Sequence, residues 1–321
     1  MGSIFLCVNM VKGWVVIWVA WVCAVFAEDE CGTDNYDSCS LHLSTVCTLW
    51  ELTTFQDTFF HQVTFITDLD IGCSLTFVNC TMTNVVFTNQ GNAVLSLSSL
   101  SFQNCVGDIE FLASSVNPGD TGQSLLTVAN ATFTDCIGAS VSFNAIQSDV
   151  TQTDSVLLDV SGLTVSNSQM TFEFYSDSNI NPEPVFFSWM RGTMGGIYLG
   201  APEFANSTVD VSLQYDGSIT ASGVTVDPHN FTYHAIEIWG IKIESLKSTD
   251  TTFGVFDMST TGTIQFDSPS ITVSDSDPTP SLATSAIWIR HPFLSETNIT
   301  SFTATVDGDL IIETNFSGEG Y

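Results

Sequence analysis

The chain has 321 residues, of which 35 are acidic and five are basic, so its formal net charge at pH 7 is −30. A surface of that sign repels nucleic acid and anionic membranes, and it favours solubility, divalent cations and basic partners. The composition therefore argues against a nucleic-acid-binding protein, although acidity alone names no ligand.

The first 27 residues have the pattern of a secretory signal. Lys12 is followed by an uncharged stretch, residues 13–26 (GWVVIWVAWVCAVF), and Ala27 precedes acidic residues 28–30. This stretch is shorter than the ~20 residues of a membrane-spanning helix, and small residues before a cleavage point are typical of signals. We predict a signal peptide over residues 1–27 and a secreted or cell-surface product with no membrane span after cleavage.

Residues 28–73 are predicted to form a Cys-rich N-terminal cap together with the first coil of the fold. Seven cysteines remain after cleavage, all in the first half of the chain. An oxidising compartment permits disulfides, and an odd number leaves at least one thiol free or paired between chains. The four cysteines expected to staple the cap are Cys31, Cys39, Cys47 and Cys73.

A short phrase then recurs along the chain: residues 74–80 read SLTFVNC, 99–105 SLSFQNC, 130–136 NATFTDC and 162–168 GLTVSNS. Starts that lie 25, 31 and 32 residues apart indicate one stacked supersecondary unit per repeat. Asn and Asp suit a bend, because they tolerate a left-handed backbone and hydrogen-bond locally. Stacking would bring Asn79, Asn104, Asp135 and Asn167 into one ladder at the bends.

The same stacking predicts two further ladders. The inner one comprises Phe77, Phe102, Phe133 and Val165, which would bury apolar area from coil to coil. The other comprises Cys80, Cys105 and Cys136, which would form either a buried row of thiols or pairs between adjacent coils.

Alternating runs rich in Val, Ile, Thr and Phe continue to the end of the chain, and helical periodicity is nearly absent after residue 28. Short strands separated by Gly, Asn, Asp, Ser or Pro fit a parallel β-helix or an array of β-sandwich repeats. The repeated bends favour the parallel β-helix over residues 74–321, with coils expected to continue beyond residue 321.

The repeated phrase resembles the right-handed parallel β-helix, or pectin-lyase-like, superfamily, and in particular its adhesin-type members with F-x-N-C repeats. The resemblance covers residues 74–168. It implies display, adhesion or polysaccharide recognition without deciding among them.

Chemistry on such a fold would need converging carboxylates with a cation. Arg290 and His291 follow a predicted strand and are the weak catalytic candidates, and Lys242 and Lys247 near Glu237 and Glu244 are the second. The strings of galacturonase-like enzymes and the motif G-x-S-x-G are absent from the sequence. A bound cofactor is not expected, although Ca²⁺ could bind at Asp307 and Asp309, at Asp275 and Asp277, or at Asp68 and Asp70.

Aromatic side chains in the irregular second half are a better lead, because aromatic faces stack on sugars and anchor interfaces when they are exposed. They are Trp189, Tyr198, Trp239 and Trp288; burial inside wide coils is the alternative. Six sequons predict a glycoprotein, at Asn79, Asn130, Asn206, Asn230, Asn298 and Asn315.

These features predict a secreted or cell-surface glycoprotein that acts as a non-catalytic adhesin, coat or filament scaffold. Its expected partners are a polysaccharide, a cell-surface glycoprotein, or further copies stacked end to end. The alternative is a β-helix polysaccharide lyase or glycoside hydrolase, so the enzymatic status stays open. A β-sandwich receptor array is the third hypothesis.

Overall fold

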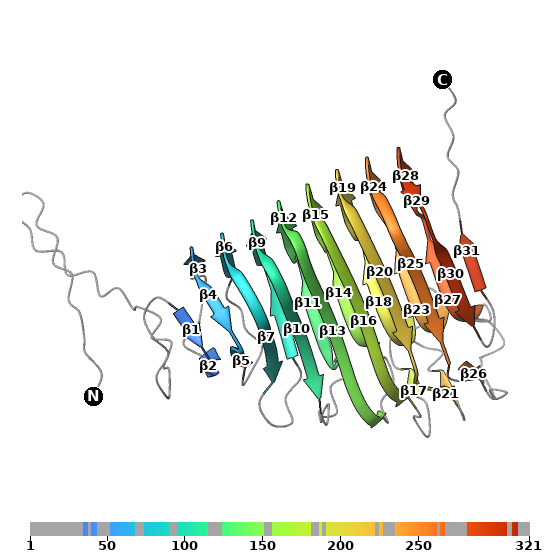
Figure 1. Cartoon of the computed structure of the whole chain (residues 1–321). Helices are drawn as coiled ribbons and strands as arrows, with labels where there is room; N and C mark the ends of the chain where they lie inside the picture. The colour runs from blue at the N-terminus through green and yellow to red at the C-terminus, as the bar shows by residue number, and fades with distance from the viewer. Residues whose placement is uncertain are drawn as a thin grey trace, which may run out of the picture.

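The computed structural model describes the residues in these ranges: 35–37, 40–43, 52–67, 74–89, 95–114, 124–150, 156–180, 186–187, 191–221, 225–226, 235–261, 264–266, 281–306 and 310–313. Within these ranges the regular elements are all β-strands. The strands stack side by side in chain order from the N-terminal to the C-terminal end (Figure 1). The fold is a parallel β-helix-like solenoid, which confirms the all-β prediction.

Three parallel sheets make the walls of the solenoid. Sheet 1 contains β1 (Asn35–Asp37), β2 (Ser40–Leu43), β4 (Phe59–His61), β5 (Thr64–Thr67), β7 (Thr81–Asn89), β10 (Val106–Ser114), β13 (Ile137–Val150), β16 (Gln169–Ile180), β20 (Thr208–Tyr215), β21 (Ile219–Ala221), β25 (Thr252–Thr260), β26 (Ile264–Phe266), β29 (Asn298–Ile299) and β30 (Phe302–Val306). Sheet 2 contains β3 (Leu52–Gln56), β6 (Ser74–Val78), β9 (Leu100–Gln103), β12 (Thr132–Thr134), β15 (Thr164–Ser166), β19 (Glu203–Ala205), β24 (Lys247–Thr249) and β28 (Phe293–Ser295).

Sheet 3 contains β8 (Leu95–Ser98), β11 (Leu126–Ala129), β14 (Val156–Ser161), β18 (Arg191–Gly200), β23 (Ala235–Glu244), β27 (Ser281–Arg290) and β31 (Leu310–Glu313). A small extra pair joins β17 (Phe186–Phe187) to β22 (Thr225–Val226). The strand pairs described are parallel, whereas a β-sandwich array requires antiparallel pairs. The prediction of parallel β-helix-like stacking is therefore confirmed, and the β-sandwich alternative is wrong.

The core is built from the predicted inner ladder. Phe77 pairs with Phe102, Phe102 with Phe133, and Phe133 with Val165. The rings of Phe77 and Phe102 stack at 4.9 Å, and those of Phe102 and Phe133 at 4.7 Å. A second ladder on sheet 1 stacks Phe87, Phe111, Phe143 and Phe174. Each aromatic ring thus covers the ring of the preceding coil, which no single coil could do alone.

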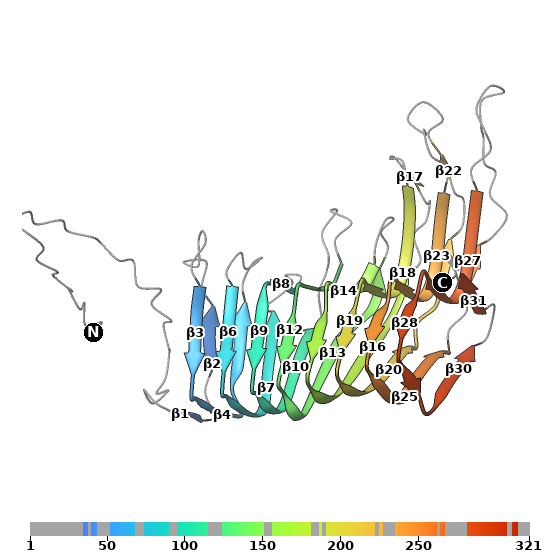
Figure 2. The same cartoon turned by 90° about the horizontal axis from the view of Figure 1, so that it is seen from above.

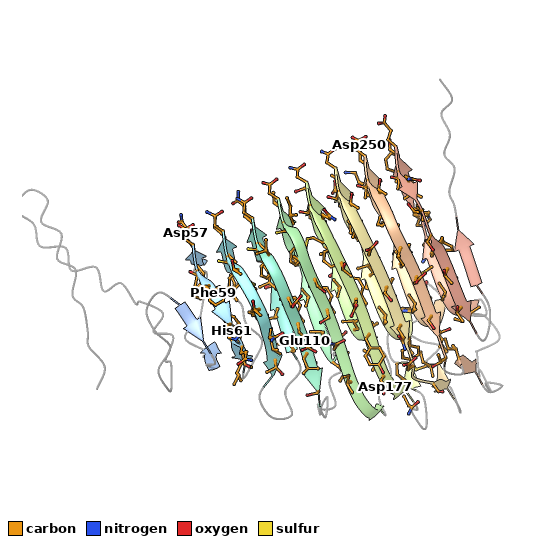
Figure 3. All side chains as sticks on the ribbon, viewed as in Figure 1. Asp57, Phe59, His61, Glu110, Asp177 and Asp250 are labelled. Atoms are coloured by element: carbon orange, nitrogen blue, oxygen red, sulfur yellow. The ribbon has the colours of Figure 1, made fainter. Side chains whose placement is uncertain are left out.

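The predicted bends are also present. Asn79, Asn104, Asp135 and Asn167 all have left-handed backbones, with φ between 51° and 55°. Asn104 donates its side-chain amide to Asn79 at 3.1 Å. The ladder extends past the visible phrase, with left-handed residues at Asp57, Asn206, Asp250 and Glu296. Asp57 and Asp250 mark this edge near the two ends of the stack (Figure 3).

The residue after each bend places its side chain against the backbone of the bend. Its hydroxyl or thiol lies within hydrogen-bonding distance of the carbonyl two residues earlier, for example Cys105 with Gln103 at 3.5 Å and Ser168 with Ser166 at 2.7 Å. Ser207, Thr251 and Thr297 do the same in later coils. Cys80, Cys105 and Cys136 belong to this ladder as free, buried thiols, so the row of thiols is correct and the pairing between coils is not. The predicted cap residues Cys31, Cys39, Cys47 and Cys73 lie outside the described residues.

The coils widen along the chain. Phe77 and its register partner Phe102 are 25 residues apart, whereas Ser248 and its partner Leu294 are 46 residues apart. The added length extends β18, β23 and β27 beyond the shorter strands of sheet 3 (Figure 2). It also adds β21 and β26 to sheet 1 (Figure 1). The widened half positions the candidate site.

Candidate functional site

The candidate residues lie on the outer face of sheet 3. Tyr198, Lys242 and Trp288 are register partners on β18, β23 and β27. Their chain neighbours, such as Ile241 and Ile243, belong to the core, and because strand side chains alternate, the three point away from it. We call the group that surrounds Lys242 the Lys242 cluster; it consists of Tyr198, Glu237, Trp239, Lys242, Glu244, Trp288 and Arg290.

Lys242 is the centre of this cluster. Its side chain is only 5% exposed, and its Nζ lies 2.6 Å from Glu237 Oε2 and 3.6 Å from Glu244 Oε2. The same Nζ lies 4.6 Å from the ring centre of Trp239 and 5.1 Å from that of Trp288. An ammonium group held between carboxylates and aromatic faces is stabilised by charge pairing and by cation–π attraction.

Arg290 closes the cluster from the next coil. Its Nη1 lies 3.4 Å from Glu237 Oε1 and 3.7 Å from Glu244 Oε1, and its Cζ lies 4.9 Å from the Trp288 ring centre. The Tyr198 hydroxyl donates to Glu244 Oε2 at 3.2 Å. Burial and the nearby Glu244 carboxylate raise the pKa of Tyr198 to about 12. Each carboxylate therefore contacts both cations, and three successive coils are tied together.

Two groups of candidate residues that lie far apart in the sequence are close together in the structure. Arg290 and the pair Lys242–Glu237 were distinct candidates, and folding brings them into one cluster. His291 follows Arg290 in a left-handed bend and is not part of the cluster. Lys247 is also apart, because it forms an exposed ion pair with Glu203 at 2.6 Å.

Of the two alternatives for these aromatic residues, exposure is wrong for Trp239 and Trp288, which are buried. They are not in the core, however, because they lie on the outer face against Lys242 and, for Trp239, over Gly195. A side chain on Gly195 would collide with the Trp239 indole, so the glycine makes room for it. Trp189 lies outside the described residues.

Unpartnered polar atoms lie on the same face. Trp239 Nε1, Trp288 Nε1 and Asp159 Oδ1 are buried without a hydrogen-bond partner, and Asp159 is the register partner of Tyr198. Burial raises the pKa of the Asp159 carboxyl to about 6. The sequence did not single out Asp159, because nothing in a local pattern shows which outward residues a neighbouring coil will cover.

The remaining predicted sites are the glycosylation sequons and the candidate Ca²⁺ ligands. Asn79, Asn130, Asn206 and Asn298 are exposed, and Asn230 and Asn315 lie outside the described residues, as do all six candidate Ca²⁺ aspartates. Within the described part of the chain, no three His, Cys, Asp or Glu side chains gather in a way that could hold a metal ion. The described residues also include no helix that is long and apolar enough to cross a membrane.

Comparisons with models of known families, with curated proteins and with solved structures find no match for this chain.

Proposed function

We propose that the mature chain is an extracellular, non-catalytic β-helix scaffold that binds a polysaccharide or a cell-surface glycoprotein through its outer faces. The observation that supports this proposal is the pairing inside the Lys242 cluster. Both glutamates contact both cations, and Lys242 is buried. Carboxylates paired in this way tie neighbouring coils together, whereas a general acid or base must lie within hydrogen-bonding reach of a substrate proton.

The repeated residues support the same proposal. Phenylalanine rings, bend asparagines and the hydroxyl or thiol after each bend recur in coil after coil. Recurrence in each coil is what packing requires, whereas a catalytic site needs a constellation that occurs once. The resemblance to β-helix adhesins and the predicted signal peptide both support an extracellular location.

The Lys242 cluster offers a place for recognition at its rim. Arg290 and Glu244 keep about a quarter and a third of their side-chain surface exposed, 25% and 30%, and Tyr198 is partly exposed. A guanidinium, a carboxylate and a phenol beside aromatic carbon match the mixed polar and apolar surface of a sugar ring.

A polysaccharide-active enzyme is the second candidate function, because the cluster does bring two carboxylates and two cations together. Its best residues are Glu237 and Glu244, with Arg290 as the cation. This hypothesis requires the ion pairs to open when a substrate binds.

One experiment separates the two functions. The secreted protein is incubated, with and without Ca²⁺, with plant, algal and animal polysaccharides, while new reducing ends and unsaturated products are followed; retention on each immobilised polysaccharide is measured in parallel. We expect retention without turnover, weakened in Arg290→Ala and unchanged in Lys247→Ala, which removes an exposed ion pair. Turnover that Glu237→Gln abolishes would instead establish an enzyme.

A further inference from the structure

The ring of Tyr198 lies against the outer face of sheet 3. Leu199 belongs to the core, so the next outward residue on β18 is Gly200, which is buried. A Cβ on Gly200 would lie 2.7 Å from Cε1 of Tyr198 and 3.0 Å from its hydroxyl oxygen. Tyr198 itself keeps part of its surface exposed. Its ring therefore lies between the Gly200 backbone and solvent, in the space that any side chain at position 200 would fill.

Contacts with neighbouring coils hold the Tyr198 ring in this position. Its hydroxyl donates to Glu244 at 3.2 Å, and Lys242 Nζ lies 5.9 Å from its ring centre. Because the ring is already ordered, a ligand that binds to it costs little side-chain entropy. An exposed aromatic face attracts the C–H groups on one side of a sugar ring, and the rim groups of Arg290 and Glu244 can meet the sugar hydroxyls.

The cations that could attract an acidic sugar are already paired. The Lys and Arg side chains that the structure describes are Lys242, Lys247 and Arg290, and each forms an ion pair with at least one glutamate. A carboxylate or sulfate group on a ligand would have to displace a glutamate from its cation. It would do so in the field of a protein whose net charge is −30. The charges near Tyr198 therefore disfavour an acidic polysaccharide.

A cationic sugar meets the same obstacle. Glu237 and Glu244 each contact both Lys242 and Arg290, so an amino sugar would have to displace one of these cations. Sugar hydroxyls carry no net charge, and they can donate to and accept from paired groups without separating them. Resting on the function proposed above, we infer that the polysaccharide recognised at the rim of the Lys242 cluster is a neutral one, with a sugar ring stacked on Tyr198.

The test compares polysaccharides that share a backbone and differ in charge. The probes are hydroxyethyl cellulose against carboxymethyl and quaternised cellulose, agarose against carrageenan, and methyl-esterified pectin against polygalacturonate. Binding of the full secreted chain to each immobilised probe is measured by surface plasmon resonance in about 50 mM and about 500 mM NaCl, because salt screens binding that depends on charge. We expect at least one neutral probe to bind about tenfold or more tightly than its charged counterparts, with an affinity that salt changes by less than about twofold.

Three substitutions locate the sugar on Tyr198. Tyr198→Ala removes the ring and should raise the dissociation constant of the neutral probe about tenfold or more, whereas Tyr198→Phe keeps the ring and should change it by about threefold or less. Tyr175→Ala is the control and should change nothing, because it removes a partly exposed tyrosine of β16, in sheet 1. Circular dichroism confirms folding, and the comparison of neutral with charged probes uses the wild type, so it stands even if Tyr198→Ala unfolds.

A charged probe that binds more tightly than its neutral counterpart, or binding that is lost at high salt, would overturn this inference and leave the proposed function intact. Folded Tyr198→Ala that binds as tightly as the wild type would overturn it in the same way. If none of the probes binds, the proposed recognition of a polysaccharide fails together with the inference.

Discussion

At the scale of single residues, burial decides how much a charged side chain contributes to stability. Lys242 is buried with two glutamates and two tryptophans around it, whereas Lys247 forms an ion pair of the same 2.6 Å length at the surface. The environment, rather than the distance, sets how much each pair contributes, since water and salt screen the exposed pair much more than the partly buried one.

Replacing Lys242 with Met should lower the free energy of unfolding by about 3 kcal/mol or more, because two partly buried carboxylates lose their main cation. Lys247→Met should change it by roughly 0–1 kcal/mol, as exposed pairs do. Urea unfolding of both variants measures the difference. Equal effects would show that Lys242 is not the centre of the cluster.

Asp159 makes stability depend on pH. Its pKa is raised from 3.8 to about 6 by burial, so the folded protein keeps a proton that the unfolded chain has already lost. Stability is therefore lost as the pH rises from about 4 to about 6. Asp159→Asn removes this cost, and we expect the variant to be more stable than the wild type at pH 7 by up to about 3 kcal/mol, but not at pH 4.

Thermal unfolding at the two pH values measures the difference in stability between Asp159→Asn and the wild type. Asp177→Asn, an exposed aspartate on β16 (Figure 3), is the control and should shift little at either pH. A gain in stability that is the same at pH 4 and pH 7 would contradict the argument.

At the scale of the elements, backbone geometry decides what each coil tolerates. Gly107 at the start of β10 has φ +102°, and a Cβ there would lie 1.6 Å from the Met82 carbonyl oxygen. Gly138 at the start of β13 also has a positive φ, +74°, but a Cβ there would meet nothing within 4 Å.

Alanine substitutions at the two positions distinguish the cost of a left-handed backbone from the cost of a steric collision. Gly138→Ala should cost about 1 kcal/mol, the usual price of a left-handed backbone for a residue with a side chain. Gly107→Ala should cost several times more or prevent folding, because the β7 backbone must also move. Yields of soluble protein and chemical unfolding midpoints measure both variants. If the two midpoints agree, contact between β7 and β10 does not restrict Gly107.

At the scale of the whole molecule, each coil contacts only its neighbours, so stability is distributed along the stack. Among the described strands, β9, β12 and β15 pair with a neighbouring coil on both sides, whereas β28, β29 and β30 pair on one side only. Local opening is easiest where the fewest apolar contacts must break.

Hydrogen exchange followed by mass spectrometry should therefore be slowest in β9, β12 and β15 and fastest in β28 to β30. Uniform exchange along the chain would instead show that the solenoid opens as one unit.

The architecture could be read from the sequence because it is repeated locally. The phrase of residues 74–168 showed the inner phenylalanines, the left-handed bends and the thiol ladder, since each depends on residue types at short spacing. The later coils were harder to recognise. Their bends at Asn206, Asp250 and Glu296 are intact, but Ser248 replaces the inner phenylalanine, and the intervening loops are longer.

By itself, the sequence determined the class of fold, the parallel stacking and one row of bend residues over residues 74–168, because alternation and bend chemistry are properties of a few consecutive residues. Only the tertiary structure decided that Arg290, Lys242 and Glu237 meet, and that Trp239 and Trp288 are buried on the outer face. These contacts join residues on different coils. They depend on the register between coils and on the length of each intervening loop, which no local pattern carries.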